Sequence, residues 1–302
     1  MRKISLFLCL CACFSAQAAF SGGRPEAGKN PPPGPNSVYD SQGFFNDALF
    51  SAESAFTEID QEPTPEDLYY LGRAVAATIL ASYEPYNGNP ELTRYLNLIC
   101  QAIVINSPTI ELFNGSYVLI LDSPELNAFA SPGGHILITK GLVELTKSED
   151  MLAAIIAHEL AHVKLKHGIK MIIDMQFYDE MTAIANRAFD FSGRDSARAR
   201  RLMDFRGSVT TLTDTMLKNG YSYSQEFEAD QEALSLLAAA GYDPGALREV
   251  LYMLLEKQIP GGMGINATHP NPVERVRSIE RWIRYYRVQD NRRYRVPRFK
   301  NN

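Results

Sequence analysis

One apolar stretch with three polar residues inside it constrains the fold of this chain more than any other feature. Residues 152–165 have the apolar pattern of a buried helix, but His158, Glu159 and His162 interrupt it. Residues four apart lie on the same face of a helix, so the two imidazoles can point at one ion with Glu159 beside it. Polar groups buried on such a helix need partners, and a metal ion supplies one. The stretch therefore predicts a buried helix that binds a metal.

The order of these residues is the zinc-peptidase pattern His-Glu-x-x-His, although three fixed positions can also arise by chance. A catalytic zinc ion takes three protein ligands and leaves one position for water, so a third ligand is needed. Glu226 is the best candidate, because Asp230 lies four residues later on the same helical face and can orient one of the histidines. Glu228 should point elsewhere. Glu180 is a rival at a shorter spacing that lacks such a partner, and we expect one Zn²⁺ per chain.

The first 18 residues have the features of a secretory signal peptide. A positively charged start precedes an apolar run that is too short to span a membrane, and small residues follow up to Ala18. We expect cleavage after Ala18; the alternative is a lipoprotein that is anchored to a membrane at Cys13. Residues 19–63 begin rich in proline and glycine and are predicted to be a disordered leader.

The net charge argues against a nucleic-acid-binding protein, and the cysteine content argues against a disulfide-bonded one. Loss of the signal peptide moves the formal net charge from −5 to −7, which argues against nucleic acid as a partner. Three of the four cysteines lie in the signal peptide, so the mature chain keeps only Cys100. An intramolecular disulfide is therefore excluded in the mature chain.

Helix and strand signals follow one another from residue 64 onward. A proline after Thr64 predicts a helix to about residue 82, and a second helix is expected over about 91–105. The period then changes, and residues 117–121 and 135–139 are predicted to be strands before the helices resume. We expect an α+β fold, mainly α-helical, with a small sheet beside the helix that carries the two histidines. The metallopeptidase domain should span residues 64–288.

Two segments of the chain permit more than one interpretation. Residues 170–220 form either an ordinary helical insertion or a lid over the metal site, because an insertion between metal ligands must begin and end beside that site. Residues 289–302 are basic and are expected to form a solvated tail, with contact to an anionic membrane surface as the alternative.

His269 and Arg275 are candidate catalytic residues near the C-terminus. His269 precedes a proline on a predicted loop, and Arg275 follows in the first turn of the last predicted helix. They could be a capping histidine and a structural ion pair. Alternatively, His269 could fill the open zinc position at rest, with Arg275 holding Glu226 or the developing oxyanion. His135 and His167 are not predicted to be ligands.

Together these motifs resemble the gluzincin family of CAAX prenyl proteases and HtpX. They are especially similar to its soluble periplasmic branch of BepA-like and LoiP-like proteins and to the mitochondrial Oma-type proteases. The resemblance covers most of residues 65–287, and it is carried by the histidine helix and by residues 71–73, 127–130, 133–136, 226–230, 241–244 and 268–270. It implies that His158, His162 and Glu226 bind zinc, that Glu159 is the catalytic base and that Asp230 supports a ligand. The C-terminal helical repeats of the BepA branch are absent from this sequence, so docking to an outer-membrane assembly machine is left open.

The chemistry of such a site predicts peptide hydrolysis, in which Glu159 takes a proton from the bound water and passes it to the leaving amine. An extended substrate could pair as an added strand with the segment that runs from Asn127 and Ala128 to Gly134 and His135. The alternative is a sheet edge that only supports the helix.

We therefore expect a zinc metalloendopeptidase that cleaves unfolded or misassembled envelope proteins, with self-inhibition as an option. The signal peptide and the resemblance place it in the periplasm of a Gram-negative bacterium. The alternative function is a latent, non-proteolytic, chaperone-like binding protein that keeps the zinc site. Peripheral contact with a membrane is a further option, and the oligomeric state is left open.

Overall fold

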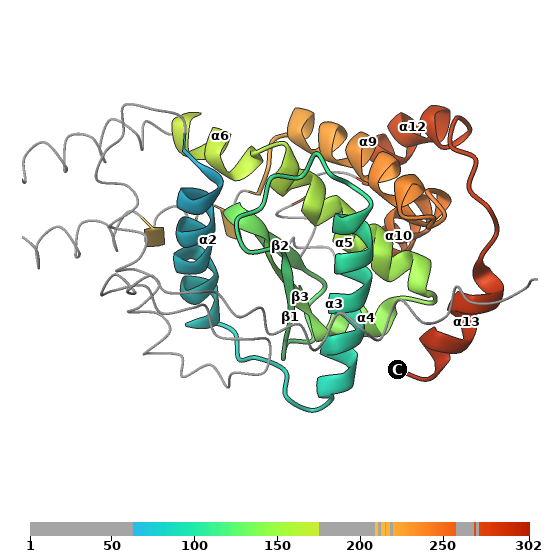
Figure 1. Cartoon of the computed structure of the whole chain (residues 1–302), viewed down its shortest axis with the longest axis horizontal. Helices are drawn as coiled ribbons and strands as arrows, with labels where there is room; N and C mark the ends of the chain where they lie inside the picture. The colour runs from blue at the N-terminus through green and yellow to red at the C-terminus, as the bar shows by residue number, and fades with distance from the viewer. Residues whose placement is uncertain are drawn as a thin grey trace, which may run out of the picture. The chain divides into compact units, whose positions relative to one another are not determined.

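The computed structural model describes residues 63–174, 209–210, 213–214, 216–217, 220–257, 269 and 272–302 (Figure 1). The predicted signal peptide, nearly all of the leader and most of the predicted insertion lie outside these residues, and so does Glu180. Within the described part of the chain, no helix combines the length and the apolar character that crossing a membrane requires.

Helices dominate the structure, and their first residues follow from local capping chemistry. Thr64 and Asp67 form a reciprocal capping box at the start of the first described helix, and Ser148 caps the helix that carries His158. The helices are α2 (Pro65–Leu80), α3 (Pro90–Ile105), α4 (Lys140–Leu145), α5 (Glu149–Lys164), α6 (His167–Asp174), α9 (Tyr223–Ala239), α10 (Gly245–Glu256), α12 (Pro272–Ile283) and α13 (Arg292–Lys300).

A three-stranded sheet lies beside these helices, with the strands in the order β1-β3-β2. β1 (Tyr117–Leu121) pairs in parallel with β3 (His135–Thr139), while β2 (Ala128–Ser131) pairs with β3 in the antiparallel direction. The predicted α+β class and both predicted strands are confirmed, and β2 is an additional strand. β3 is paired on both sides, whereas β2 is an outer strand of this sheet among the described residues, so pairing of a substrate with the segment that begins at Asn127 and Ala128 stays a prediction.

α5 is the central helix of the fold. Every residue from Glu149 to His162 is buried, and the helix packs against α9, α10, α3 and β2. Ile156 and Leu160 are fully enclosed and share one apolar cluster with Leu237 of α9. Each such side chain contributes about 1.5–3 kcal/mol through burial. Apolar packing therefore fixes α5 against α9, and these two helices carry the candidate ligands.

A main-chain contact holds α2 against the turn between β2 and β3. A methyl group on Gly72 would lie 1.6 Å from the carbonyl oxygen of Pro132, and one on Gly133 would lie 2.4 Å from the Cα atom of Tyr69. Gly133 also adopts a φ of 74°, which favours glycine. The close approach of α2 to this turn therefore depends on glycine at both positions.

The C-terminal basic segment differs from the expected solvated tail. It contains α13, from which Arg295 is buried and lies 3.0 Å from the carboxylate of Asp150. The same arginine donates a hydrogen bond to the carbonyl oxygen of Gly241 at 2.9 Å. α13 is thus attached to the first turn of α5.

Candidate metal centre

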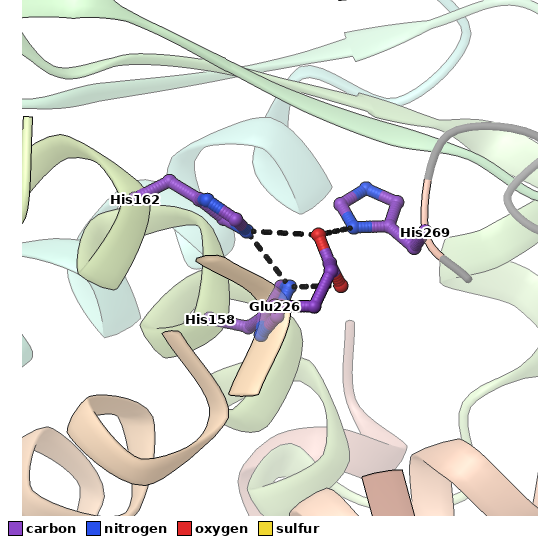
Figure 2. Close-up of side chains that lie close together, drawn as sticks. All are labelled: His158, His162, Glu226 and His269. Carbon is purple, nitrogen blue, oxygen red and sulfur yellow. Dashed lines mark hydrogen bonds and ion pairs between the residues drawn. The ribbon is translucent and has the colours of Figure 1, made fainter. Parts of the chain in front are cut away.

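Four buried side chains direct donor atoms at one point between α5 and α9 (Figure 2). His158, His162, Glu226 and His269 each supply one donor atom, and these atoms all lie within 4.8 Å of one another. The Nε2 atoms of the two α5 histidines are 3.1 Å apart, and the Glu226 carboxylate lies 3.5 Å from the first and 3.4 Å from the second. The structure thus brings the three predicted ligands together and adds His269.

The chemistry of these donors fits zinc, which binds imidazole nitrogen and carboxylate oxygen. The carboxylate of Glu159 is also buried at this site, and its Oε2 atom has no hydrogen-bond partner among the described residues. A buried polar atom without a partner is costly, so the site fits a metal with a bound water better than a closed polar core. His158, His162 and Glu226 would hold this metal, with His269 beside them.

Asp230 and Arg275 surround the candidate ligands with charge. Asp230 Oδ1 lies 3.1 Å from Nδ1 of His158, while Arg275 donates to both oxygens of Asp230 at 2.8 and 2.6 Å. Arg275 Nη1 also lies 2.8 Å from Oε2 of Glu226. Asp230 therefore stands where an orienting residue for His158 is expected, and Arg275 holds two buried carboxylates in place.

Burial and charge act on the site carboxylates in opposite directions. Burial raises the pKa of Glu159, against the opposing effect of His269 and His158. Burial also favours protonation of Glu226, but His269 and Arg275 outweigh it and hold the pKa of Glu226 well below its ordinary value. Glu226 is therefore suited to act as an anionic ligand, whereas Glu159 is suited to accept and release a proton.

Three further residues, which were not predicted to act at the site, lie around His162. Tyr221 and His167 contact its ring, and Glu228 contacts His167. The ring of Tyr221 stacks on the His162 ring at a centroid distance of 3.9 Å, and its hydroxyl donates to the carbonyl oxygen of Ala130 at 3.3 Å. Nδ1 of His167 lies 2.9 Å from Nδ1 of His162, and Glu228 contacts the far side of His167. The sequence gives no periodic signal for these contacts, because a spacing of five places two residues on different faces of one helix.

An open cleft lies next to His162, with about 520 Å³ of space including solvent at its mouth. Residues from the end of β2 and the following turn line it, together with the start of α2 and Tyr221. The four predicted substrate-binding residues, Asn127, Ala128, Gly134 and His135, are absent from this lining. Among the described residues, the cleft is instead bordered by Ala130–Gly133.

Comparison with known proteins agrees with this geometry. Residues 90–283 match the model of peptidase family M48. The mitochondrial metalloendopeptidase OMA1 of Schizosaccharomyces pombe is 29% identical over 207 residues, which cover 68% of this chain and 55% of that protein. The beta-barrel assembly-enhancing proteases of Yersinia pestis and Escherichia coli are 24% and 25% identical, over 75% and 64% of this chain and 44% and 39% of their own lengths. The chain thus spans about half or less of the length of these relatives. It belongs to peptidase family M48.

Proposed function

We propose that this chain is a zinc-dependent metalloendopeptidase that cleaves unfolded or misassembled proteins of the cell envelope. The observation that carries the proposal is the meeting of four buried donors with a buried carboxylate, Glu159, that lacks a complete set of partners. Membership of family M48 and relatives named as metalloendopeptidases support the reaction type.

The residues of the chain have distinct roles in this reaction. A bound zinc ion would lower the pKa of its water and polarise the scissile carbonyl. Glu159 takes the proton of the attacking water and delivers it to the leaving amine, for which its raised pKa is suitable. Asp230 orients His158, and Arg275 keeps Glu226 and Asp230 in position.

His269 has the position expected of a residue that silences the site. Its Nδ1 lies 2.8 Å from Oε1 of Glu226, within the group of four donors. A fourth protein ligand would compete with the water that hydrolysis requires. We therefore expect His269→Ala to raise the cleavage of an unfolded protein several-fold at saturating zinc. Unchanged or lower activity would favour the capping role, and His135→Ala serves as a control for histidine loss outside the donor group.

An extended substrate would reach the site along β2 rather than β3. Ala130 and the following turn border the cleft beside His162, whereas β3 is enclosed between two strands. Main-chain pairing with a strand edge holds a peptide extended largely independently of its side chains. Such binding suits unfolded proteins as a substrate class.

The predicted signal peptide and the names of the relatives support a cellular setting for this function. A secretory signal peptide, as predicted for residues 1–18, would deliver the chain to the periplasm. Two of the relatives are named beta-barrel assembly-enhancing proteases, which supports envelope proteins as substrates and contact with outer-membrane assembly. A chaperone-like protein without proteolysis is the alternative, but such a protein has no need of Glu159.

The replacement Glu159→Gln tests the proposed function. It removes the proton acceptor but none of the proposed ligands, so zinc content should remain near one per chain while cleavage of an unfolded substrate falls by about 10²–10⁴-fold. Glu280→Gln, an equal loss of charge on the exposed face of α12, is the matched control and should cleave normally. Cleavage by Glu159→Gln at the wild-type rate would refute the mechanism.

A further inference from the structure

His167 and Glu228 extend the polar contacts of the metal centre from its second histidine to the surface. Nδ1 of His162 lies 2.9 Å from Nδ1 of His167, and Nε2 of His167 lies 3.3 Å from Oε2 of Glu228. Both histidine side chains are completely buried, whereas 54% of the Glu228 side chain is exposed. Two polar side chains, those of His167 and Glu228, therefore lead from a candidate ligand to solvent.

The position of the ligand atom determines where the protons lie along these contacts. Nε2 of His162 faces Nε2 of His158 and the Glu226 carboxylate, so this nitrogen must offer its lone pair to a cation. The proton of the neutral His162 ring is then on Nδ1 and can be donated to Nδ1 of His167. His167 carries its own proton on Nε2 and donates it to Glu228, which can only accept when ionised.

We propose, on the basis of the metal centre proposed above, that His167 is a positioning residue that holds His162 in the tautomer with the proton on Nδ1. Glu228 in turn holds His167 in the tautomer with the proton on Nε2. The two histidine ligands are thus oriented by different groups, because His158 faces the carboxylate of Asp230 directly. Such contacts to the second ring nitrogen of a ligand fix its orientation and raise its affinity for the metal.

The break between α5 and α6 allows the rings of His162 and His167 to meet. On an uninterrupted helix, residues 162 and 167 would lie about 140° apart around the axis. Lys166 instead adopts a φ of 55°, which ends α5 and allows α6 to begin at His167. The ring of Tyr221 lies against one face of His162 at an interplanar angle of 13°, so the imidazole is held both at its edge and on its face.

Zinc affinity, measured on the full chain by competition with a chromophoric chelator, tests the role of His167. In His167→Asn the amide oxygen can replace Nδ1 as an acceptor, whereas His167→Phe fills a similar volume without one. We expect the Phe variant to bind zinc about 10–100-fold more weakly than wild type and the Asn variant to stay within about threefold of it. Wild-type affinity in the Phe variant, or equal losses in both variants, would overturn the proposal.

A matched pair of carboxylate variants on α9 tests the role of Glu228. Glu228→Leu should weaken zinc binding by about three- to tenfold, a smaller loss than that of His167→Phe because Glu228 lies one contact further from the ligand. Glu232→Leu removes an equal charge one turn later, from a residue bonded to Lys164, and should bind zinc normally. In the His167→Phe background, Glu228→Leu should have no further effect. A fully additive loss would contradict an action through His167.

The wild-type protein provides a test that does not depend on a variant folding. Two-bond ¹H–¹⁵N spectra of the zinc-loaded chain should show His162 protonated at Nδ1 and His167 protonated at Nε2. A proton on Nδ1 of His167 would refute the proposal. Failure of the wild-type chain to bind zinc would refute the proposed function instead, whereas equal zinc affinity in every variant would refute only the role of His167 and Glu228.

Discussion

The two ends of α5 hold buried charge in different ways. In the first turn, Glu149 accepts hydrogen bonds from the hydroxyl of Tyr95 at 2.8 Å, the hydroxyl of Tyr242 at 3.2 Å and Nε of Arg298 at 2.9 Å. The next residue, Asp150, accepts from Nε of Arg295 at 3.0 Å and from a main-chain amide. Partners within the protein thus satisfy both carboxylates, which also lie at the favourable positive end of the helix dipole.

The opposite end of α5 leaves part of its bonding capacity open. Two ring nitrogens face each other at 3.1 Å, and one oxygen of Glu159 has no hydrogen-bond partner in the part of the chain that is described. The difference shows that burial alone does not identify a functional site, since both ends are equally buried. What separates them is whether the protein itself completes the contacts. We expect changes in the first turn to reduce stability and changes near the histidines to reduce metal binding.

Replacement of Glu149 by leucine should reduce stability more than any single change at the histidine end of α5. It leaves two buried tyrosine hydroxyls without an acceptor and Arg298 without its carboxylate, so the free energy of unfolding should fall by about 3 kcal/mol. Urea unfolding measures this loss. Glu149→Gln retains an acceptor and should lose less. If the free energy of zinc binding fell by more than the free energy of unfolding, the proposed difference between the two ends of α5 would be wrong.

His135 should make the stability of the protein depend on pH. This effect must be removed before acid unfolding can be used to compare the two ends of α5. Burial and the charge of Arg73 lower the pKa of His135 to about 4, so between pH 6.5 and 4 the unfolded chain binds a proton that the folded chain does not. Stability should therefore fall as the pH drops through this window, by about 2 kcal/mol after allowance for the partial exposure of the residue. His135→Gln should flatten the curve of unfolding free energy against pH. An unchanged slope would assign the acid sensitivity to other groups.

A change at the break after α5 should have the smallest effect. Lys166 has a φ of 55°, a conformation that glycine adopts without steric cost, so Lys166→Gly should raise the free energy of unfolding by about 0.5 kcal/mol. Lys170→Gly, within α6, is the matched control and should lower it by about 1 kcal/mol. Thermal melts of both variants check these signs. Equal losses would show that the conformation of Lys166 is not strained.

The sequence predicted those features that depend on periodicity and local capping. The bounds of β1 and β3 agree with their runs of aliphatic residues, and α5 begins after the Ser148 cap as expected. The short, largely small-residue sequence of β2 carries no clear alternation, so this strand was missed. α13 was missed because its position depends on ion pairs with residues about 145 positions earlier, which no local pattern encodes.

In the candidate site, too, the features set by helical spacing could be predicted, and those set by contacts between distant residues could not. The spacing of His158 and His162 and that of Glu226 and Asp230 are helical, and the structure places all four side chains together. His167 could not be predicted, because its contact depends on a left-handed residue at Lys166, where the sequence has no glycine. The cleft lining could not be predicted either, because it depends on how α2 meets the turn after β2.

The contact between α2 and that turn separates the shape of the cleft from its chemistry. Gly72 and Gly133 let main chain meet main chain, so the spacing between these two walls is set without any side chain. The side chain of Leu68 lines the cleft from α2, which this contact positions, but it does not determine that spacing. If peptides bind in this cleft as proposed, substitutions at the lining should change which peptides bind while the width stays constant. A methyl group at either glycine would instead force the two walls apart and change the width of the cleft itself.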